Sequence, residues 1–240
     1  MRVAALYDIH GNLPALEAVL PEVEAAGADL VLVGGDVASG PMPVETLARL
    51  QELGDRVRFI RGNADRVLDL EGLDDPFVQA RRWVAERLED DQLDFLAGLP
   101  VDAVLDVDGV GRVRFCHGAP GSDEEGITSL TSDERLAGLL EEVDERVVVC
   151  GHTHVQFDRR LGEVRVVNAG SVGFPWEAQP GAYWLLAGPE LTFQRTAYDV
   201  DEAVRRIRAT GHPQTEWAAG QLLAVDPSRP GRMSARLADG

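Results

Sequence analysis

The stretch VAALYDIHGNLPALEAVLPEVEAAGADLVLVGGD, residues 3–36, decides the fold. Its first five residues form a short apolar run, which we interpret as a buried strand. Residues 13–26 then carry apolar side chains at helical spacing, and Gly27 marks the end of this predicted helix. A second apolar run at 30–33 predicts the next strand, so the stretch begins as strand, helix, strand.

The same alternation continues with a predicted helix over 44–53 and a strand over 57–60. This order favours a parallel sheet, whose ligands bind outside the carboxyl ends of the strands. Residues 66–98 are interpreted as helical, with Phe77 among the inward positions.

The second half is richer in strands. We predict a hairpin from 101–107 and 113–116, and further strands at 147–150, 155–160, 164–168 and 182–187. A last amphipathic helix is predicted at 201–210. We therefore expect one domain over residues 1–205 and a C-terminal extension over 206–240, whose last part is rich in Pro, Gly, Ser and Arg and is expected to be mobile.

Charge and composition restrict the molecules that the protein can bind and the compartment in which we expect it. The 240 residues carry a formal charge of −18, which disfavours broad nucleic-acid binding but not a small phosphorylated substrate beside metal ions. We expect no membrane span, because no run reaches about 18 apolar residues, and no secretion signal, because a charge falls within the first ten positions. With only Cys116 and Cys150, we expect a reducing, cytoplasmic location. The sequence leaves open whether the chain forms a homo-oligomer.

Polar side chains cluster where the predicted strands end. The clusters are Asp8-Ile9-His10, Asp36, Gly62-Asn63-Ala64-Asp65, His117-Gly118 and Gly151-His152-Thr153-His154. Side chains two residues apart on an extended segment point the same way, so we expect Asp8 and His10 to reach one ion. The two histidines of the last cluster have the same spacing.

Each cluster alone has a simpler explanation. An aspartate after a strand is usually a cap or turn former, and a single buried histidine is more often a hydrogen-bonded core residue. However, four of the five histidines of the chain fall in these clusters, together with carboxylates and an amide. The combined pattern therefore predicts a metal site.

The donor types indicate which ions would bind. The predicted ligands are Asp8, His10, Asp36, Asn63, His117, His152 and His154. Imidazole, carboxylate and one amide oxygen, without thiolate, suit Mn²⁺, Fe, Zn²⁺, Co²⁺ or Ni²⁺ rather than Ca²⁺, and among these we expect Mn²⁺. So many donors exceed one open tetrahedral site and suit two ions about 3.5–4 Å apart with a bridging carboxylate.

The ordered series D-x-H, G-D, G-N-x-D, H and G-H-x-H resembles the calcineurin-like metallophosphoesterase superfamily. The opening YDIHGNLPALEAVL and the segment NAGSVG at 168–173 resemble its small bacterial and archaeal phosphodiesterase branch. The resemblance spans residues 1–205 and implies an α/β (α+β) fold, a four-layer αββα sandwich of two mixed β-sheets flanked by helices. It also implies a hydrolase, a phosphoesterase with two divalent metal ions that cleaves phosphodiesters.

Roles for single residues follow from the same resemblance. One ion would be held by Asp8, His10 and His154, the other by Asn63, His117 and His152, with Asp36 as the bridge. A metal-bridging water or hydroxide would attack phosphorus in line, with Asp36 and Asn63 in the catalytic centre. We add Asn12, just after His10, as a candidate phosphate contact.

One position departs from the superfamily pattern. Many members have Gly-Asn-His at the third cluster, where the histidine binds phosphate or protonates the leaving group, whereas this chain has Ala64. Asp65 is the candidate replacement acid, and its alternative role is that of a turn or supporting residue. General acid help is typically worth about 10²–10⁴ in rate, so we expect activated or aryl-like diesters to be preferred.

Other functions stay open. The same site could act on phosphomonoesters, phosphoproteins, dinucleoside polyphosphates or cyclic nucleotides. A metal-dependent amidohydrolase also uses His-x-His, but after the first strand of a barrel, whereas here the pair begins at His152 and hairpins replace the helices that a barrel needs. A non-catalytic scaffold with the same fold is expected to have lost its ligands, whereas here every ligand position carries a competent side chain.

Overall fold

The first apolar run forms β1 (Val3–Leu6), the central strand of a five-stranded sheet. It pairs in parallel with β2 (Leu30–Val33), which pairs in parallel with β3 (Val57–Phe59). On its other side β1 is antiparallel to β9 (Ala182–Ala187), which is followed by the edge strand β10 (Leu191–Thr196). Because β1, β2 and β3 are parallel, the loops that follow them meet at one edge of the sheet.

A second five-stranded sheet has the order β4-β5-β6-β8-β7. Its strands are β4 (Asp102–Val107), β5 (Gly111–Cys116), β6 (Val147–Cys150), β7 (Phe157–Leu161) and β8 (Val164–Asn168). The central pairs β5–β6 and β6–β8 are parallel, and the outer pairs β4–β5 and β7–β8 are antiparallel. The loops after β5 and β6 therefore leave this sheet at a common edge as well.

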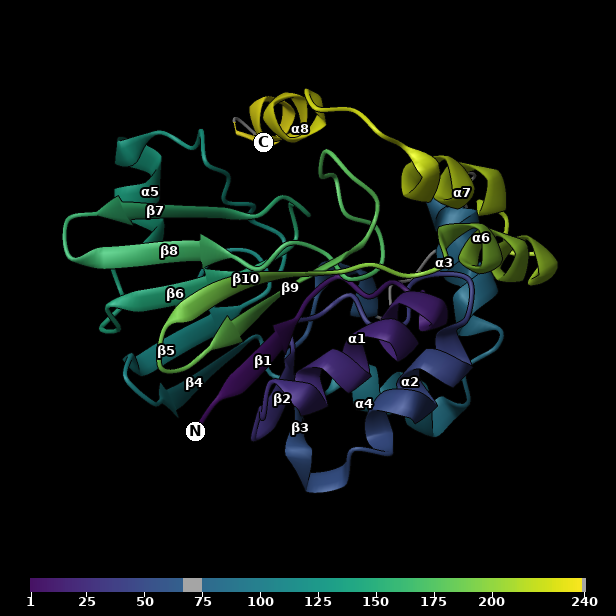
Figure 1. The fold of residues 1–240 in the computed structure, drawn as a ribbon, viewed down its shortest axis with the longest axis horizontal. Coiled ribbons are helices and arrows are strands. Elements are labelled where there is room, and N and C mark those ends of the chain that lie inside the picture. Colours follow the sequence, from purple (N-terminus) through teal and green to yellow (C-terminus); the bar gives the residue numbers. More distant parts are fainter. Residues whose placement is uncertain (67–74, 239–240) are drawn as a thin grey trace.

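The structure is a computed structural model that describes residues 1–66 and 75–238. Helices in this part are α1 (Leu13–Ala25), α2 (Pro43–Gln51), α3 (Pro76–Ala85), α4 (Asp90–Ala97), α5 (Asp133–Leu139), α6 (Val200–Ala209), α7 (Thr215–Leu223) and α8 (Arg229–Leu237), with 3-10 turns η1 (Gly54–Arg56) and η2 (Asn63–Asp65). Helices α1, α2 and α4 lie against the first sheet, and α5 lies beside the second (Figure 1). The predicted αββα sandwich of two mixed sheets is confirmed.

The alternation of side chains along β1 explains why its sequence is apolar throughout. Val3, Ala5 and Tyr7 belong to the core between the two sheets, whereas Ala4 and Leu6 belong to the core under the helices. A strand buried on both faces needs apolar residues at every position. Beyond the strand, the Tyr7 hydroxyl donates a hydrogen bond of 3.1 Å to the Val149 carbonyl, so it connects the first sheet to β6 of the second.

Several elements differ from the sequence prediction. Residues 66–98 form two helices, α3 and α4, and residues 67–74 of that prediction lie outside the described residues. Phe77 is 61% exposed, so the expectation that it points inward is wrong. Strand β10 and helices α5, α7 and α8 were not predicted.

The C-terminal extension forms helices. Buried side chains of α6 and α7, among them Val204, Ile207 and Leu222, pack with Leu13 and Phe174 of the domain. An extended stretch then leads to α8, which lies apart from α6 and α7 (Figure 1). The domain boundary at residue 205 falls within α6, and the division of the chain there stays a prediction.

Within residues 1–66 and 75–238, no helix has both the length and the apolar character needed to cross a membrane.

Tyr7 provides a test of the contact between the sheets. We expect Tyr7→Phe to lower the free energy of unfolding by about 1 kcal/mol, because the Val149 carbonyl loses a buried donor. Tyr7→Ala also opens a cavity in the core and should cost about 3–5 kcal/mol. Urea denaturation of the purified proteins measures both values. Equal stability of Tyr7→Phe and the wild-type protein would show that the hydrogen bond contributes nothing.

Candidate metal centre

The predicted ligands meet where the strands end, and five of them lie on left-handed backbone. Asp8 and His10 follow β1, Asp36 follows β2, and His152 and His154 follow β6. Their φ angles are 53°, 49°, 52°, 64° and 56°, and no other non-glycine residue among those described has a positive φ. Such backbone costs about 1–3 kcal/mol per residue and persists only where the surrounding structure enforces it.

The left-handed turns correct the expectation that Asp8 and His10 share an extended segment. Both side chains do reach one place, but they do so because the chain turns at each of these two residues. Hydrogen bonds between loops hold the turns: the amides of Asp8 and His10 donate to the carbonyls of Gly35 and Asp36, at 3.2 and 2.8 Å. The loop after β1 is therefore fixed on the loop after β2.

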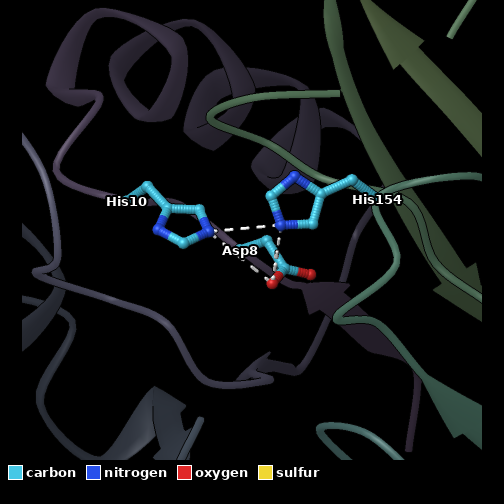
Figure 2. A group of neighbouring side chains, drawn as sticks. All are labelled: Asp8, His10 and His154. Atoms are coloured by element: carbon cyan, nitrogen blue, oxygen red, sulfur yellow. Dashed lines mark hydrogen bonds and ion pairs between the residues drawn. The ribbon is translucent and has the colours of Figure 1, made fainter. Parts of the chain in front are cut away.

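Asp8, His10 and His154 form the first group of ligand atoms. The Nε2 atoms of His10 and His154 lie 3.2 Å apart. The Asp8 Oδ1 atom lies 3.2 Å from His154 Nε2 and 3.8 Å from His10 Nε2. Figure 2 shows the two rings facing each other beside this carboxylate. All three side chains thus present one atom to a common point.

The second group contains His117, His152, Asn63 and Asp36. His117 Nε2 lies 3.2 Å from both Asn63 Oδ1 and His152 Nδ1. Asp36 Oδ2 is 3.6 Å from His117 Nε2. These four residues come from the loops after β3, β5, β6 and β2, so both sheets contribute to the group.

Two carboxylates lie between the groups. Asp36 Oδ2 is 3.6 Å from the Nε2 atoms of both His10 and His117. Asp8 Oδ1 is 3.8 Å from the same two nitrogens. Asp8 and Asp36 are therefore both near enough to serve both groups, so the geometry does not single out Asp36 as the bridge.

Backbone carbonyls set the tautomers of the histidines. The Nδ1 atoms of His117 and His154 lie 2.8 and 2.7 Å from the carbonyls of Gly34 and Phe174. A carbonyl can only accept, so each Nδ1 carries the proton and a neutral ring leaves Nε2 with a free lone pair. Such contacts also fix the orientation of metal-binding histidines in general.

The charges of the cluster suit a cation. Burial lowers the pKa of His154, but the Asp8 carboxylate outweighs burial and the net pKa is raised, whereas the pKa of His10 is lowered by burial. Burial raises the pKa of Asp8, but His154 and His117 outweigh it and the net pKa is lowered. Asp8 Oδ1 is buried without a hydrogen-bond partner in the part of the chain that the structure describes. Ring nitrogens 3.2 Å apart with a buried carboxylate oxygen beside them fit a divalent ion with nitrogen and oxygen ligands.

Asp65 lies behind the cluster. Its carboxylate accepts hydrogen bonds from the backbone amides of Gly62, Asp36 and Val37, at 2.7–2.9 Å. Burial and the nearby Asp36 raise the pKa of Asp65 to about 7. The geometry thus gives Asp65 a supporting role, and its role as an acid stays a prediction.

Ala64 lies at the front of the cluster. Its amide donates a hydrogen bond of 2.8 Å to Asp36 Oδ1, and the residue lines the cavity above the ligands. Asn12 is instead fully buried: it caps α1 by accepting from the Ala15 amide and donates to the Gly173 carbonyl at 2.8 Å. Its contact with phosphate stays a prediction.

Two residues that we did not predict support the cluster. Ser39 lies next to His10, with its Oγ atom 2.7 Å and its carbonyl oxygen 3.2 Å from His10 Nδ1. Arg81 of α3 donates a hydrogen bond of 3.3 Å to the Asn63 carbonyl. No sequence pattern marks either residue, because only the folded chain brings the loop of Ser39 and helix α3 to the ligands.

The sequence and the structure match known proteins. Residues 1–188 match the calcineurin-like phosphoesterase superfamily domain. The chain is 29% identical to phosphodiesterase YfcE of Escherichia coli over 195 residues, which are 78% of this chain and 87% of that protein.

Solved structures have the same fold. A metallophosphoesterase from Sphaerobacter thermophilus superposes with a TM-score of 0.75 at 26% identity, covering 92% of this chain and 98% of that one. A hypothetical protein from Pyrococcus horikoshii has a TM-score of 0.80 at 22% identity, with 94% and 99% covered. Because the family match extends over residues 1–188 of 240, the chain belongs to the calcineurin-like phosphoesterase superfamily.

Proposed function

We propose that the protein is a phosphodiesterase that depends on two divalent metal ions. The observation that supports this most is the pair of adjacent ligand groups with Asp8 and Asp36 between them. In the proposed site Asp8, His10 and His154 hold one ion and Asn63, His117 and His152 hold the other, with Asp36 shared. Mn²⁺ is the proposed ion, and the nitrogen and oxygen donors are also compatible with Fe, Zn²⁺, Co²⁺ or Ni²⁺.

When bound, the two ions would lower the pKa of a bound water and neutralise charge on the phosphoryl group. The protein's own residues hold the ligands ready for this chemistry. Carbonyls of Gly34 and Phe174 keep protons on the Nδ1 atoms of His117 and His154, so that their Nε2 atoms can bind. The Ala64 amide holds one oxygen of Asp36 and leaves the other facing the histidines.

Two observations favour a diester with a good leaving group. The relative YfcE is named a phosphodiesterase. The methyl group of Ala64 cannot donate a proton to a leaving oxygen, and the Asp65 carboxylate already accepts three backbone hydrogen bonds. A leaving group that needs no acid, such as a nitrophenolate, should therefore depart faster than an alkoxide.

Metal dependence is the first test. We expect chelation to abolish hydrolysis of bis(p-nitrophenyl) phosphate and Mn²⁺ to restore it. Mn²⁺ at about 100 times its Kd should also raise the Tm by about 5–10 °C, because it binds only the folded state.

Asp36→Asn should lower kcat/KM at least about 100-fold, whereas Asp55→Asn, at an exposed carboxylate in η1, should leave it unchanged. Turnover that persists in protein shown to be free of metal by elemental analysis would contradict the proposal.

Ala64 provides the second test, of leaving-group preference. We expect wild-type protein to hydrolyse p-nitrophenyl diesters at least about 100 times faster than alkyl diesters. Ala64→His introduces a proton donor at the cavity wall and should narrow this ratio by about tenfold or more. Ala64→Asn has a similar polar side chain but no acid function, and it serves as the control. A wild-type enzyme that hydrolyses both classes equally fast would show that the acid is supplied elsewhere.

A further inference from the structure

A cavity of about 620 Å³ opens directly above the metal cluster. Predicted ligands form one part of its lining, among them His10, Asn63 and His152. Much of the rest comes from α3, from the segment around Phe174, and from α7 and α8 of the C-terminal extension. Small-ligand sites typically measure about 300–1,000 Å³, so this volume exceeds what a phosphate group alone would fill.

Aromatic rings lead from the cluster to α7. The ring of Trp176 lies 5.0 Å from that of His154, and the ring of Phe174 lies 5.8 Å from that of His10. Trp217 of α7 follows, with its ring centre 5.6 Å from that of Phe174. A ligand whose phosphorus lies at the metal ions can therefore place an attached group against aromatic surface.

Two aromatic side chains of this lining are open to solvent. Trp217 is 42% exposed and Phe77 of α3 is 61% exposed, although both are large and apolar. Exposed apolar side chains that gather at a concave surface are typical of binding sites. Aromatic side chains also lose little conformational entropy when a flat ligand stacks on them.

The charges of the lining are compatible with a phosphorylated ligand. Two arginines face the cavity, Arg81 of α3 and Arg236 of α8, in a chain whose formal charge is −18. Arg81 is held near the cluster by its hydrogen bond to the Asn63 carbonyl. The cavity therefore combines cationic groups with aromatic walls, which matches an aromatic ring linked to a phosphate.

We propose that Trp217, with Trp176, binds a flat aromatic ring that the phosphoryl substrate carries, so that the C-terminal extension determines substrate specificity. The inference rests on the proposed function for the position of the phosphoryl group. Trp217 is a specificity-determining residue in this proposal, because it contacts the ring of the ligand and not the reacting atoms. The ring is that of a nucleobase or of a simple aryl ester.

Binding to the Mn²⁺-loaded protein tests the proposal without turnover. Calorimetric titrations with adenosine 5′-monophosphate, phenyl phosphate, ribose 5-phosphate and inorganic phosphate compare ligands that share the phosphoryl group. Stacking on the aromatic side chains predicts that adenosine 5′-monophosphate, phenyl phosphate or both bind about tenfold more tightly than ribose 5-phosphate. Preference for adenosine monophosphate over phenyl phosphate identifies a nucleobase site, and the reverse identifies an aryl site.

Variants of Trp217 test whether this residue causes the tighter binding of aromatic phosphates. Trp217→Ala should weaken the binding of the aromatic ligands by about tenfold and leave the affinity for ribose 5-phosphate unchanged. Trp217→Phe should retain most of the affinity for the aromatic ligands. Phe193→Ala is the matched control, because Phe193 of β10 is 41% exposed and does not line the cavity. Its affinities should equal those of the wild-type protein, and thermal melts confirm that each variant is folded.

The outcomes separate this inference from the proposed function. Equal binding of aromatic and non-aromatic phosphates, no binding of any of them, or unchanged binding in Trp217→Ala overturns the aromatic site. Tight binding of aromatic phosphates that depends on Trp217, in a protein that hydrolyses no ester, supports the aromatic site and overturns the proposed catalysis.

Discussion

Hydrogen bonds between the loop after β1 and the loop after β2 fix the geometry of the site. The amides of His10 and Gly11 donate to the carbonyls of Asp36 and Val37, so the two loops continue the alignment of the parallel strands. Close approach is needed as well: a Cβ atom at Gly62 would lie 2.2 Å from Asp36 Oδ1. The left-handed turns at the ligands follow from these contacts, which hold the donor atoms before any ion arrives.

The same arrangement places unfavourable interactions in the protein. Ring nitrogens of His10 and His154 lie 3.2 Å apart, and those of His117 and His152 lie equally close in the second group. Buried carboxylates and strained backbone add to the cost of the fold. A divalent ion would bind these nitrogen and oxygen atoms, and its binding free energy would add to the stability of the folded state.

Much of the first half could be predicted from the sequence. Each of its elements shows either the apolar spacing of a helix or the short apolar run of a buried strand. The parallel strands and α1 lie within a residue or two of their predicted bounds, and the polar clusters after them meet as expected. The backbone at Asp8 and His10 could not be predicted, since the left-handed turns depend on a neighbouring loop. Phe77 was misplaced because helical spacing does not distinguish a core from a cavity wall. Helix α8 was missed because its Gly, Pro and Ser content resembles that of a tail.

The cavity is lined by two stretches of the chain, of which the family model matches only the first. The predicted metal ligands all lie within residues 1–188, which match the family model, whereas Trp217 and Arg236 lie beyond that match. Mutations in α7 and α8 can therefore change the cavity wall while every ligand of the metal cluster stays in place. Such a division would allow the shape and chemistry of the accepted molecule to change independently of the hydrolytic centre.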